Sequence, residues 1–350
     1  MTKFDLLVYV GRFQPFHDGH LATVISALKN ARHLLILVGS ANRSRSVKNP
    51  WTVEERIAQI SEVLLDTIGP EYGDLVTLAP LDDHWYADGK WAQDVKAAAT
   101  RVTQARGGSR VGIVGHKKDA SSAYLDWFPA WGYVSQPNHA DLNSTDIRRR
   151  IFAGGDYAEA IFQMVPKATL RWITAWQNSP SGDDVYRWLQ SEAAALERYT
   201  AAWRGSPYPP TFVTADAVVV CQRKILMVTR KHAPGAGLLA LPGGFLDANE
   251  TIAECAAREL SEETGLTLAP AAFAAFSVFD HPERSQRGRT ITHAGFLTLH
   301  LDTLPEVRGT DDAVSATWVP MEEFLWNPCQ FFEDHLFIVR SLLGIRNPHG

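Results

Sequence analysis

The sequence predicts an α/β chain with two domains, in which a doubly wound parallel sheet is followed by an α+β domain. Three observations lead to this prediction. Over residues 4–176, short apolar runs alternate with helical patterns, which is typical of βαβ units. After residue 210 the chain changes to β-rich runs around a single helical pattern. A length of 350 residues also exceeds what one hydrophobic core normally holds.

Four apolar segments predict the buried parallel strands of the first domain. They occupy residues 6–10, 34–38, 75–78 and 111–114. Continuous apolar runs of this length are typical of strands that are covered on both faces. Helical patterns separate them, and Thr52 and Glu55 have the spacing of a capping box at the start of one helix. We therefore expect a doubly wound sheet.

A helical pattern over residues 183–203, followed by the chain-breaking segment SPYPP, marks the boundary between the domains. Beyond it, FVTADAVVVC and KILMVTR read as strands of the second domain. We predict a first domain at residues 1–180, a helical linker at 181–210 and a second domain at 211–350.

The composition is that of an ordinary globular protein. A formal net charge of -5 gives no field that would recruit nucleic acid or an anionic membrane. The three cysteines, Cys221, Cys255 and Cys329, lie far apart and form no CxxC pair. Neither a signal peptide nor an apolar run of membrane-spanning length is evident. We expect a cytoplasmic protein with small-molecule partners, and we leave open whether it forms homo-oligomers.

Residues 244–266, GFLDANETIAECAARELSEETGL, carry the most informative pattern in the chain. On a helix, Glu259, Glu262 and Glu263 fall at i, i+3 and i+4 and share one face. Like charges this close repel each other, and a hard cation among them would remove that cost. Mg²⁺, or Mn²⁺, bridging to substrate phosphates suits such oxygen ligands. The alternative is a solvated acidic helix face.

This segment resembles the Nudix box of the Nudix hydrolases, which cleave nucleoside diphosphates linked to another moiety. The matching positions are Gly244, Glu250, Arg258, Glu259, Leu260, Glu262, Glu263, Gly265 and Leu266. The resemblance implies a Nudix fold in which Glu259, Glu262 and Glu263 hold a divalent cation beside Gly244. It also implies that Glu263 takes part in catalysis and that Arg258 orients a carboxylate.

Two loops after the box supply further candidates. In the GTDDA loop, Asp312 could be the general base that activates water, or Asp311 and Asp312 could simply form a turn. Arg284, Arg287 and Arg289 suit a pyrophosphate or a terminal ribose phosphate. The resemblance implies that the substrate is ADP-ribose, or a related dinucleotide, and that ADP-ribose is cleaved to AMP and ribose 5-phosphate.

The segment GRFQPFHDGH, residues 11–20, follows the first predicted strand. His17 and His20 flank Gly19 where a helix begins, and a helix N-terminus attracts anions. Two imidazoles there can donate to phosphate oxygens and stabilise charge in a transition state. Gly11 and Gly19 would allow the backbone to approach a nucleotide closely.

A second segment, LNSTDIRRR at residues 142–150, is expected to complete this site. Ser144 or Thr145 would cap a helix whose N-terminus forms a phosphate clamp with Arg148. Together with the two histidines, this segment resembles the nucleotidyltransferase superfamily, in which the corresponding motif reads ISSTxxR. Thr145 and Arg148 match that motif, whereas Asn143 replaces its first serine and is not assigned.

Residues 11–20 together with residues 39–57, GSANRSRSVKNPWTVEERI, resemble the archaeal-type nicotinamide mononucleotide (NMN) adenylyltransferases, and residues 115–131 resemble bacterial members with a fused Nudix domain. The resemblance implies a Rossmann-like domain that converts NMN and ATP to NAD and pyrophosphate, with Mg²⁺ at both sites of the chain. Because a phosphate is already a nucleophile, this reaction needs no base. The residues implied in binding ATP and NMN are Gly11, Arg12, Phe13, Gly19, Trp91, Gly115 and Thr145.

Two tryptophans, Trp85 and Trp91, follow the third predicted strand. The resemblance implies that an aromatic residue of this region stacks on the nicotinamide ring, and we prefer Trp91 over Trp85. A tryptophan that faces the core from a helix is the alternative for Trp91.

Two other functions fit parts of the sequence. The second domain could be a ligand-sensing module like those of NAD-metabolism repressors, but these have an eroded box and an added winged helix. Here the box is intact, and no basic recognition helix stands out. The first domain could take another mononucleotide or a sugar phosphate, against which the GRFQPF segment and the fused second domain argue.

Overall fold

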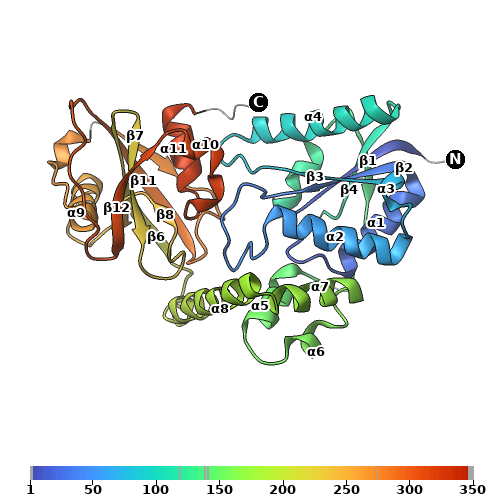
Figure 1. Ribbon diagram of the computed structural model, residues 1–350. Helices are drawn as coiled ribbons and strands as arrows, with labels where there is room; N and C mark the ends of the chain where they lie inside the picture. Colours follow the sequence, from blue (N-terminus) through green and yellow to red (C-terminus); the bar gives the residue numbers. More distant parts are fainter. Residues whose placement is uncertain (1–2, 118–119, 138, 140–141, 274, 346–350) are drawn as a thin grey trace. The chain divides into compact units, whose positions relative to one another are not determined.

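The computed structural model describes residues 3–117, 120–137, 139, 142–273 and 275–345 (Figure 1). The polypeptide divides into two compact units, Met1–Ala193 and Ala194–Gly350. The division falls inside helix α8 (Pro180–Ala201), within the segment 181–210 that the sequence predicts as a helical linker. Residues 118–119 of the motif at 115–131 lie outside the described residues.

Five parallel strands form the sheet of the first unit. They are β1 (Phe4–Gly11), β2 (Ala31–Val38), β3 (Val76–Pro80), β4 (Val111–Gly115) and β5 (Gly132–Ser135). Their order across the sheet is β3-β2-β1-β4-β5. The first four match the predicted segments. The sequence does not predict β5, because its GYVS segment has no apolar run and is only half-buried.

Helices cover both faces of this sheet, because successive strand residues point to opposite sides. Leu7 and Ile36 pack in one apolar cluster with α1 and α2, whereas Leu6 and Leu37 pack in a second cluster with α4. The helices of this unit besides α8 are α1 (Asp18–Asn30), α2 (Val53–Ile68), α3 (Tyr72–Leu75), α4 (Asp88–Arg106), α5 (Ser144–Phe152), α6 (Tyr157–Ile161) and α7 (Lys167–Gln177), with a 3₁₀ turn at Ala120–Asp126. The doubly wound arrangement is therefore confirmed.

The predicted capping box of α2 is present. Glu55 N–H donates to Thr52 Oγ1 at 3.3 Å, and Thr52 N–H donates to Glu55 Oε2 at 2.8 Å. The same Glu55 carboxylate accepts two hydrogen bonds from Arg45. Arg45 is thus held by the first turn of α2.

A mixed sheet forms the second unit, in the order β10-β11-β6-β7-β12, with β8 paired to β7 and β9 to β6. Strands β6 and β11 run parallel, and the other pairs are antiparallel. The strands are β6 (Thr211–Cys221), β7 (Lys224–Arg230), β8 (Leu239–Ala240), β9 (Gly243–Phe245), β10 (Phe276–Phe279), β11 (Arg289–Leu299) and β12 (Ala313–Pro320). The helices are α9 (Ile252–Thr264), α10 (Glu323–Trp326) and α11 (His335–Leu343), with 3₁₀ turns at Pro270–Ala272 and Pro328–Gln330. This confirms the predicted α+β domain.

The acidic segment of the sequence forms α9. Thr251 caps its start by accepting the Glu254 N–H at 3.3 Å, and Gly265 ends it in the left-handed conformation with a φ of 73°. Cys255 and Leu260 are buried in the core together with Ala217 of β6. Helix α9 therefore docks its apolar face on the sheet, which leaves the acidic face available for chemistry.

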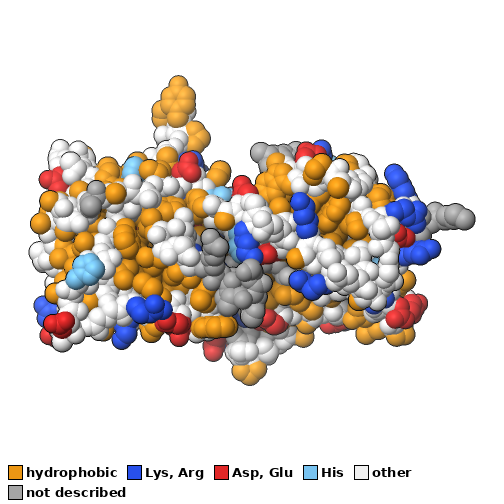
Figure 2. Space-filling model, turned by 90° about the horizontal axis from the view of Figure 1, so that it is seen from above, with side chains coloured by type: hydrophobic (Ala, Val, Ile, Leu, Met, Phe, Trp, Pro, Cys, Tyr) orange, Lys and Arg blue, Asp and Glu red, His pale blue; other side chains and the backbone are white. Residues whose placement is uncertain are grey.

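On the face of the molecule in Figure 2, basic and acidic side chains of the described residues lie interspersed between apolar ones. They form no continuous basic strip on that face. Among the helices of the described residues, none combines the length and the apolarity that crossing a bilayer requires.

Candidate active sites

The first candidate site is a cavity of about 540 Å³ in the first unit. It lies where the chain leaves β1 and β4, between which the order of the strands reverses. Open parallel sheets bind ligands at such a point. Its lining residues are Tyr9, Arg12, Phe13, Gln14, His17, Gly19, His20, Thr23, His116, Ser122, Tyr124, Pro137, His139, Leu142, Asn143, Ser144, Thr145 and Arg148. The two segments predicted to bind phosphate thus meet in one cavity.

His17 and His20 form a stacked pair at the start of α1, with ring centroids 3.6 Å apart. The His17 N–H donates to Nδ1 of His20 at 3.2 Å, so neutral His20 carries its proton on Nε2. Nδ1 of His17 is buried and has no hydrogen-bond partner among the described residues. Burial, and then the nearby His139, lowers the pKa of His17 to about 4. Burial, and then His17, lowers the pKa of His20 well below its usual value. Both imidazoles are therefore neutral near physiological pH.

Arg148 joins the two segments of the cavity. Its Nη1 donates to the carbonyl of Gln14 at 2.8 Å, its Nε to the carbonyl of Val47 at 2.9 Å, and its Nη2 to Thr145 Oγ1 at 3.2 Å. These bonds fix a buried guanidinium in the cavity wall, where its charge can act on an anionic ligand.

The cap of α5 differs from the prediction by one residue. Asn143 Oδ1 accepts the Asp146 N–H at 2.9 Å, so Asn143 is the N-cap, and Ser144 and Thr145 are not. Asparagine caps helices as well as serine does, which explains how it can replace serine here.

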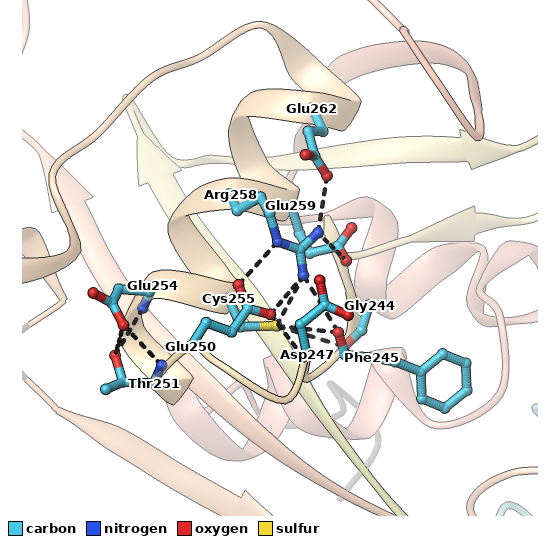
Figure 3. Close-up of polar contacts among 10 residues, drawn as sticks. All are labelled: Gly244, Phe245, Asp247, Glu250, Thr251, Glu254, Cys255, Arg258, Glu259 and Glu262. Atoms are coloured by element: carbon cyan, nitrogen blue, oxygen red, sulfur yellow. Dashed lines mark hydrogen bonds and ion pairs between the residues drawn. The ribbon is translucent and has the colours of Figure 1, made fainter.

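The second candidate site lies on the acidic face of α9 in the second unit, where Arg258 is the central residue (Figure 3). Arg258 donates to both oxygens of Glu250, at 2.7 and 2.9 Å. Its Nη1 donates to Glu259 and to Glu262, at 2.9 Å in each case. Arg258 lowers the pKa of Glu250 to about 2. Arg258 thus offsets part of the repulsion between the glutamates, which the sequence analysis expected a bound cation to offset.

Glu263 is set apart from this network. Its side chain is only 9% exposed, and it accepts the Gly243 N–H at 3.1 Å. Burial raises the pKa of Glu263 to about 8. Next to it, Glu259 lies against Gly244, where an added Cβ would come within 2.2 Å of Oε1. A side chain at position 244 would therefore displace the Glu259 carboxylate.

The three glutamates do not form a complete metal site. Glu262 is 46% exposed and is held by Arg258. No group of three Asp, Glu, His or Cys side chains within the described residues could hold a metal ion by itself. Arg258 donates to both Glu259 and Glu262, and the metal-binding role of Glu259, Glu262 and Glu263 stays a prediction.

Two domain families match the chain. The Cytidylyltransferase-like family matches residues 8–150, and the NUDIX domain family matches residues 211–337. A nicotinamide/nicotinic acid mononucleotide adenylyltransferase of Acinetobacter baylyi is 35% identical over 56% of this chain and 97% of its own length. An ADP-ribose pyrophosphatase of Methanocaldococcus jannaschii is 32% identical over 39% of this chain and 75% of its own.

Solved structures from Francisella tularensis match both units. One of them is a bifunctional NMN adenylyltransferase/ADP ribose pyrophosphatase complexed with AMP and a Mn ion. It is 35% identical, covers 97% of this chain and 99% of its own, and has a TM-score of 0.86. The chain belongs to this family of bifunctional adenylyltransferase/pyrophosphatases.

In this member of the bifunctional family, two of the glycines predicted to bind nucleotide pack against neighbouring side chains at the adenylyltransferase cavity. An added Cβ on Gly11 would come within 2.7 Å of the Phe13 ring, so Gly11 makes room for Phe13 rather than for a nucleotide. Phe13 itself lines the cavity and meets His20 edge-on at 4.9 Å. Gly115 is buried against Leu125, and the residue after it lines the cavity instead.

His116 and His139 are cavity residues that the sequence reasoning missed. His116 directly follows β4, and its Nδ1 lies 2.9 Å from the carbonyl oxygen of Gln136. Its position at the carboxyl end of a predicted parallel strand could have identified it. His139 lies near Gly19 and contributes to the low pKa of His17. No pattern in the sequence points to His139.

Trp91 lies behind the cavity wall of the bifunctional enzyme. From α4, it packs edge-on against Tyr124 at 5.5 Å and against Trp127 at 5.7 Å, beside the apolar cluster between α4 and the sheet. Tyr124 lines the cavity, whereas Trp91 is not among the lining residues described. The predicted stack on nicotinamide does not follow from this arrangement. Trp85, the other candidate, lies under the guanidinium of Arg43 at 4.1 Å.

We expect Trp91→Ala to act through stability. Loss of this packing should lower the free energy of unfolding by up to about 3 kcal/mol, as for other large-to-small core changes. Values of KM for NMN and ATP should change by similar factors, measured by steady-state kinetics beside thermal unfolding. A selective rise in KM for NMN at an unchanged melting temperature would instead place Trp91 on the pyridine ring.

Asp311 and Asp312 lie in a loop that is tied to the end of α9. The Thr310 N–H donates to the Glu263 carbonyl at 3.3 Å. Asp311 has a φ of 53°, which suits a turn residue. Asp312 is 72% exposed and lies 3.6 Å from His232. Its role as general base in the pyrophosphatase stays a prediction.

The three arginines predicted to bind the pyrophosphatase substrate have separate positions. Arg284 was predicted wrongly: it is only 3% exposed and forms a two-pronged ion pair with Asp334 at 3.0 Å. Arg289 donates to the carbonyl of Asp280. Arg287 lies over the ring of Phe245, the last residue of β9, at 4.9 Å, and its role in substrate binding stays a prediction.

These positions predict different effects for two matched variants. Arg284→Ala leaves Asp334 buried without its partner and should destabilise the protein by about 3–5 kcal/mol. Arg287→Ala should change stability little and raise KM for ADP-ribose. Urea unfolding and hydrolysis kinetics measure the two effects, with Arg289→Ala as a surface control. A stable Arg284→Ala variant with a raised KM would restore the original assignment.

Proposed function

We propose that the chain carries out two reactions of NAD metabolism, one in each unit. The first unit transfers AMP from ATP to NMN and releases pyrophosphate. The second unit hydrolyses ADP-ribose to AMP and ribose 5-phosphate. The stacked pair of His17 and His20, with an unpartnered buried nitrogen in the cavity wall, carries the first assignment. The buried Glu263, which accepts the Gly243 N–H of β9, carries the second.

In the first reaction, the cavity residues orient phosphates and stabilise charge. Nε2–H of His20 donates to a phosphate oxygen, and Arg148 adds a fixed positive charge. The phosphate of NMN attacks the α-phosphorus of ATP directly, so the site needs no general base. No carboxylate lines the described part of this cavity, which agrees with that chemistry. The predicted Mg²⁺ of this unit would therefore have no carboxylate ligand among the described lining residues.

In the second reaction, Glu259, Glu263 and the carbonyl of Gly244 would hold a divalent cation. These are hard oxygen donors, as Mg²⁺ and Mn²⁺ prefer, and the incomplete set leaves room for water and substrate oxygens. A cation bound there would neutralise the pyrophosphate and lower the pKa of a bound water. The buried Glu263 fits this role, because a cation offsets the cost of ionising a carboxylate away from water. Arg258 holds Glu259 and Glu250 in place.

A substrate panel tests both assignments on the purified chain. NMN with ATP and Mg²⁺ should give NAD. ADP-ribose should be hydrolysed faster than NADH or diadenosine phosphates, with Mg²⁺ and Mn²⁺ compared. If the chain binds ADP-ribose but hydrolyses none of these compounds, the second unit is a ligand sensor instead.

A further inference from the structure

A histidine far outside the Nudix box holds the segment that leads into β9, the strand of Gly243 and Gly244. The Leu241 N–H donates to Nδ1 of His335 at 2.8 Å, and both residues are buried. His335 is the first residue of α11. Because an N–H group is the donor, Nδ1 is the unprotonated nitrogen and the ring proton lies on Nε2. Burial lowers the pKa of His335, which keeps Nδ1 an acceptor.

The start of α11 is itself anchored in the core. Asp334, the residue before His335, is fully buried and pairs with both Nε and Nη2 of Arg284 at 3.0 Å. Asp216 of β6 and Glu333 also act electrostatically on His335. A buried, paired charge is costly to separate, so the imidazole has little freedom to move.

From Leu241, the backbone leads directly to the proposed metal ligands. The carbonyl of Pro242 accepts the Ala217 N–H at 2.8 Å, and the Gly243 N–H donates to Glu263 at 3.1 Å. Gly244 follows, with Glu259 packed against its α-carbon. A shift of the backbone at Leu241 would therefore move the groups that touch both carboxylates.

We propose that His335 is a positioning residue for the hydrolysis reaction, which acts through Leu241 to place the Gly243 N–H against Glu263 and the α-carbon of Gly244 against Glu259. The inference rests on the proposed hydrolysis in the second unit. It assigns to α11 a part in the reaction that the box sequence does not contain.

Two variants of nearly equal size test the proposal. His335→Asn keeps an oxygen acceptor close to the position of Nδ1, whereas His335→Leu has none. We expect His335→Leu to lower kcat for ADP-ribose by about tenfold or more, the scale of lost support around metal ligands. It should also raise the Mn²⁺ concentration needed for half-maximal rate. His335→Asn should recover most of both losses.

The control is Ile338→Val, which removes one methyl group from a buried residue of the same helix. It should lower the melting temperature slightly without changing kcat or the Mn²⁺ requirement, and NAD synthesis should be unchanged in every variant. If His335→Leu does not fold, His335→Gln replaces it, because glutamine displaces the acceptor by one bond. It should then be slower than His335→Asn.

The outcomes separate this inference from the proposed function. A parent chain that hydrolyses no ADP-ribose would overturn both. An active parent whose His335→Leu variant has the same kcat and Mn²⁺ requirement would overturn this inference alone. So would a His335→Asn variant that is no better than the leucine or glutamine variant.

Discussion

Replacing Glu263 by glutamine is expected to lower ADP-ribose hydrolysis by orders of magnitude while NAD synthesis continues. Glutamine keeps the size of the side chain but removes the charge that attracts a divalent cation. Initial rates over a range of Mg²⁺ and Mn²⁺ concentrations measure the effect. Part of the rate should return at high Mg²⁺ or with Mn²⁺ if metal affinity is what was lost. Hydrolysis at the parent rate would refute the metal assignment.

The same variant predicts a pH effect on stability without metal. Burial raises the pKa of Glu263 from 4.5 to about 8, so between these values the folded chain holds a proton that the unfolded chain has lost. The stability of the parent therefore falls as the pH rises through this window. The glutamine variant lacks this titration. In EDTA, its melting temperature minus that of the parent should therefore increase as the pH rises. A constant difference would contradict the burial argument.

Replacing His20 by alanine is expected to lower kcat for NAD synthesis by at least ~100-fold, the scale of losing one electrostatic stabiliser. The change removes both the stacked partner of His17 and the Nε2–H that we assign to a phosphate oxygen. A coupled assay for NAD measures it. ADP-ribose hydrolysis should be unaffected, because that site belongs to the other unit.

A matched control is His33→Ala, which removes a buried histidine of the same unit. His33 lies 2.8 Å from Thr77 in the sheet and is not among the residues described as lining the cavity. It should lower stability and leave kcat nearly unchanged. Near-normal NAD synthesis by the His20→Ala variant would show that the cavity assignment is wrong.

Local patterns were sufficient to predict most of the fold. Apolar runs indicate β1 to β4, and the spacing of Thr52 and Glu55 indicates the start of α2, because each depends on residues close in sequence. The pattern does not indicate β5, whose place depends on pairing with β4. The cap of α5 was misplaced by one residue, since Asn143 and Ser144 cap a helix about equally well.

The residues of the candidate sites were predictable only where the secondary structure determines the direction in which a side chain points. His17 and His20 meet because the turn of a helix brings i and i+3 together. Arg284 is different: its burial is decided by Asp334, a residue on another element, which no local pattern reveals. Trp91 is likewise placed by partners from the segment after β4. Motif spacing thus predicts which side chains share one face of a helix, but partners distant in the sequence decide whether those side chains face the core or the site.

Each site is closed by a bond between distant parts of its own unit, and this makes each activity a probe of folding. Arg148 meets Gln14 from the far end of the first sheet domain, and His335 meets Leu241 across most of the second. Because domains generally fold as units, each activity should return only as its own unit folds. During refolding from urea, the rate at which NAD synthesis returns would therefore report the folding of the first unit. The rate at which ADP-ribose hydrolysis returns would report the folding of the second unit.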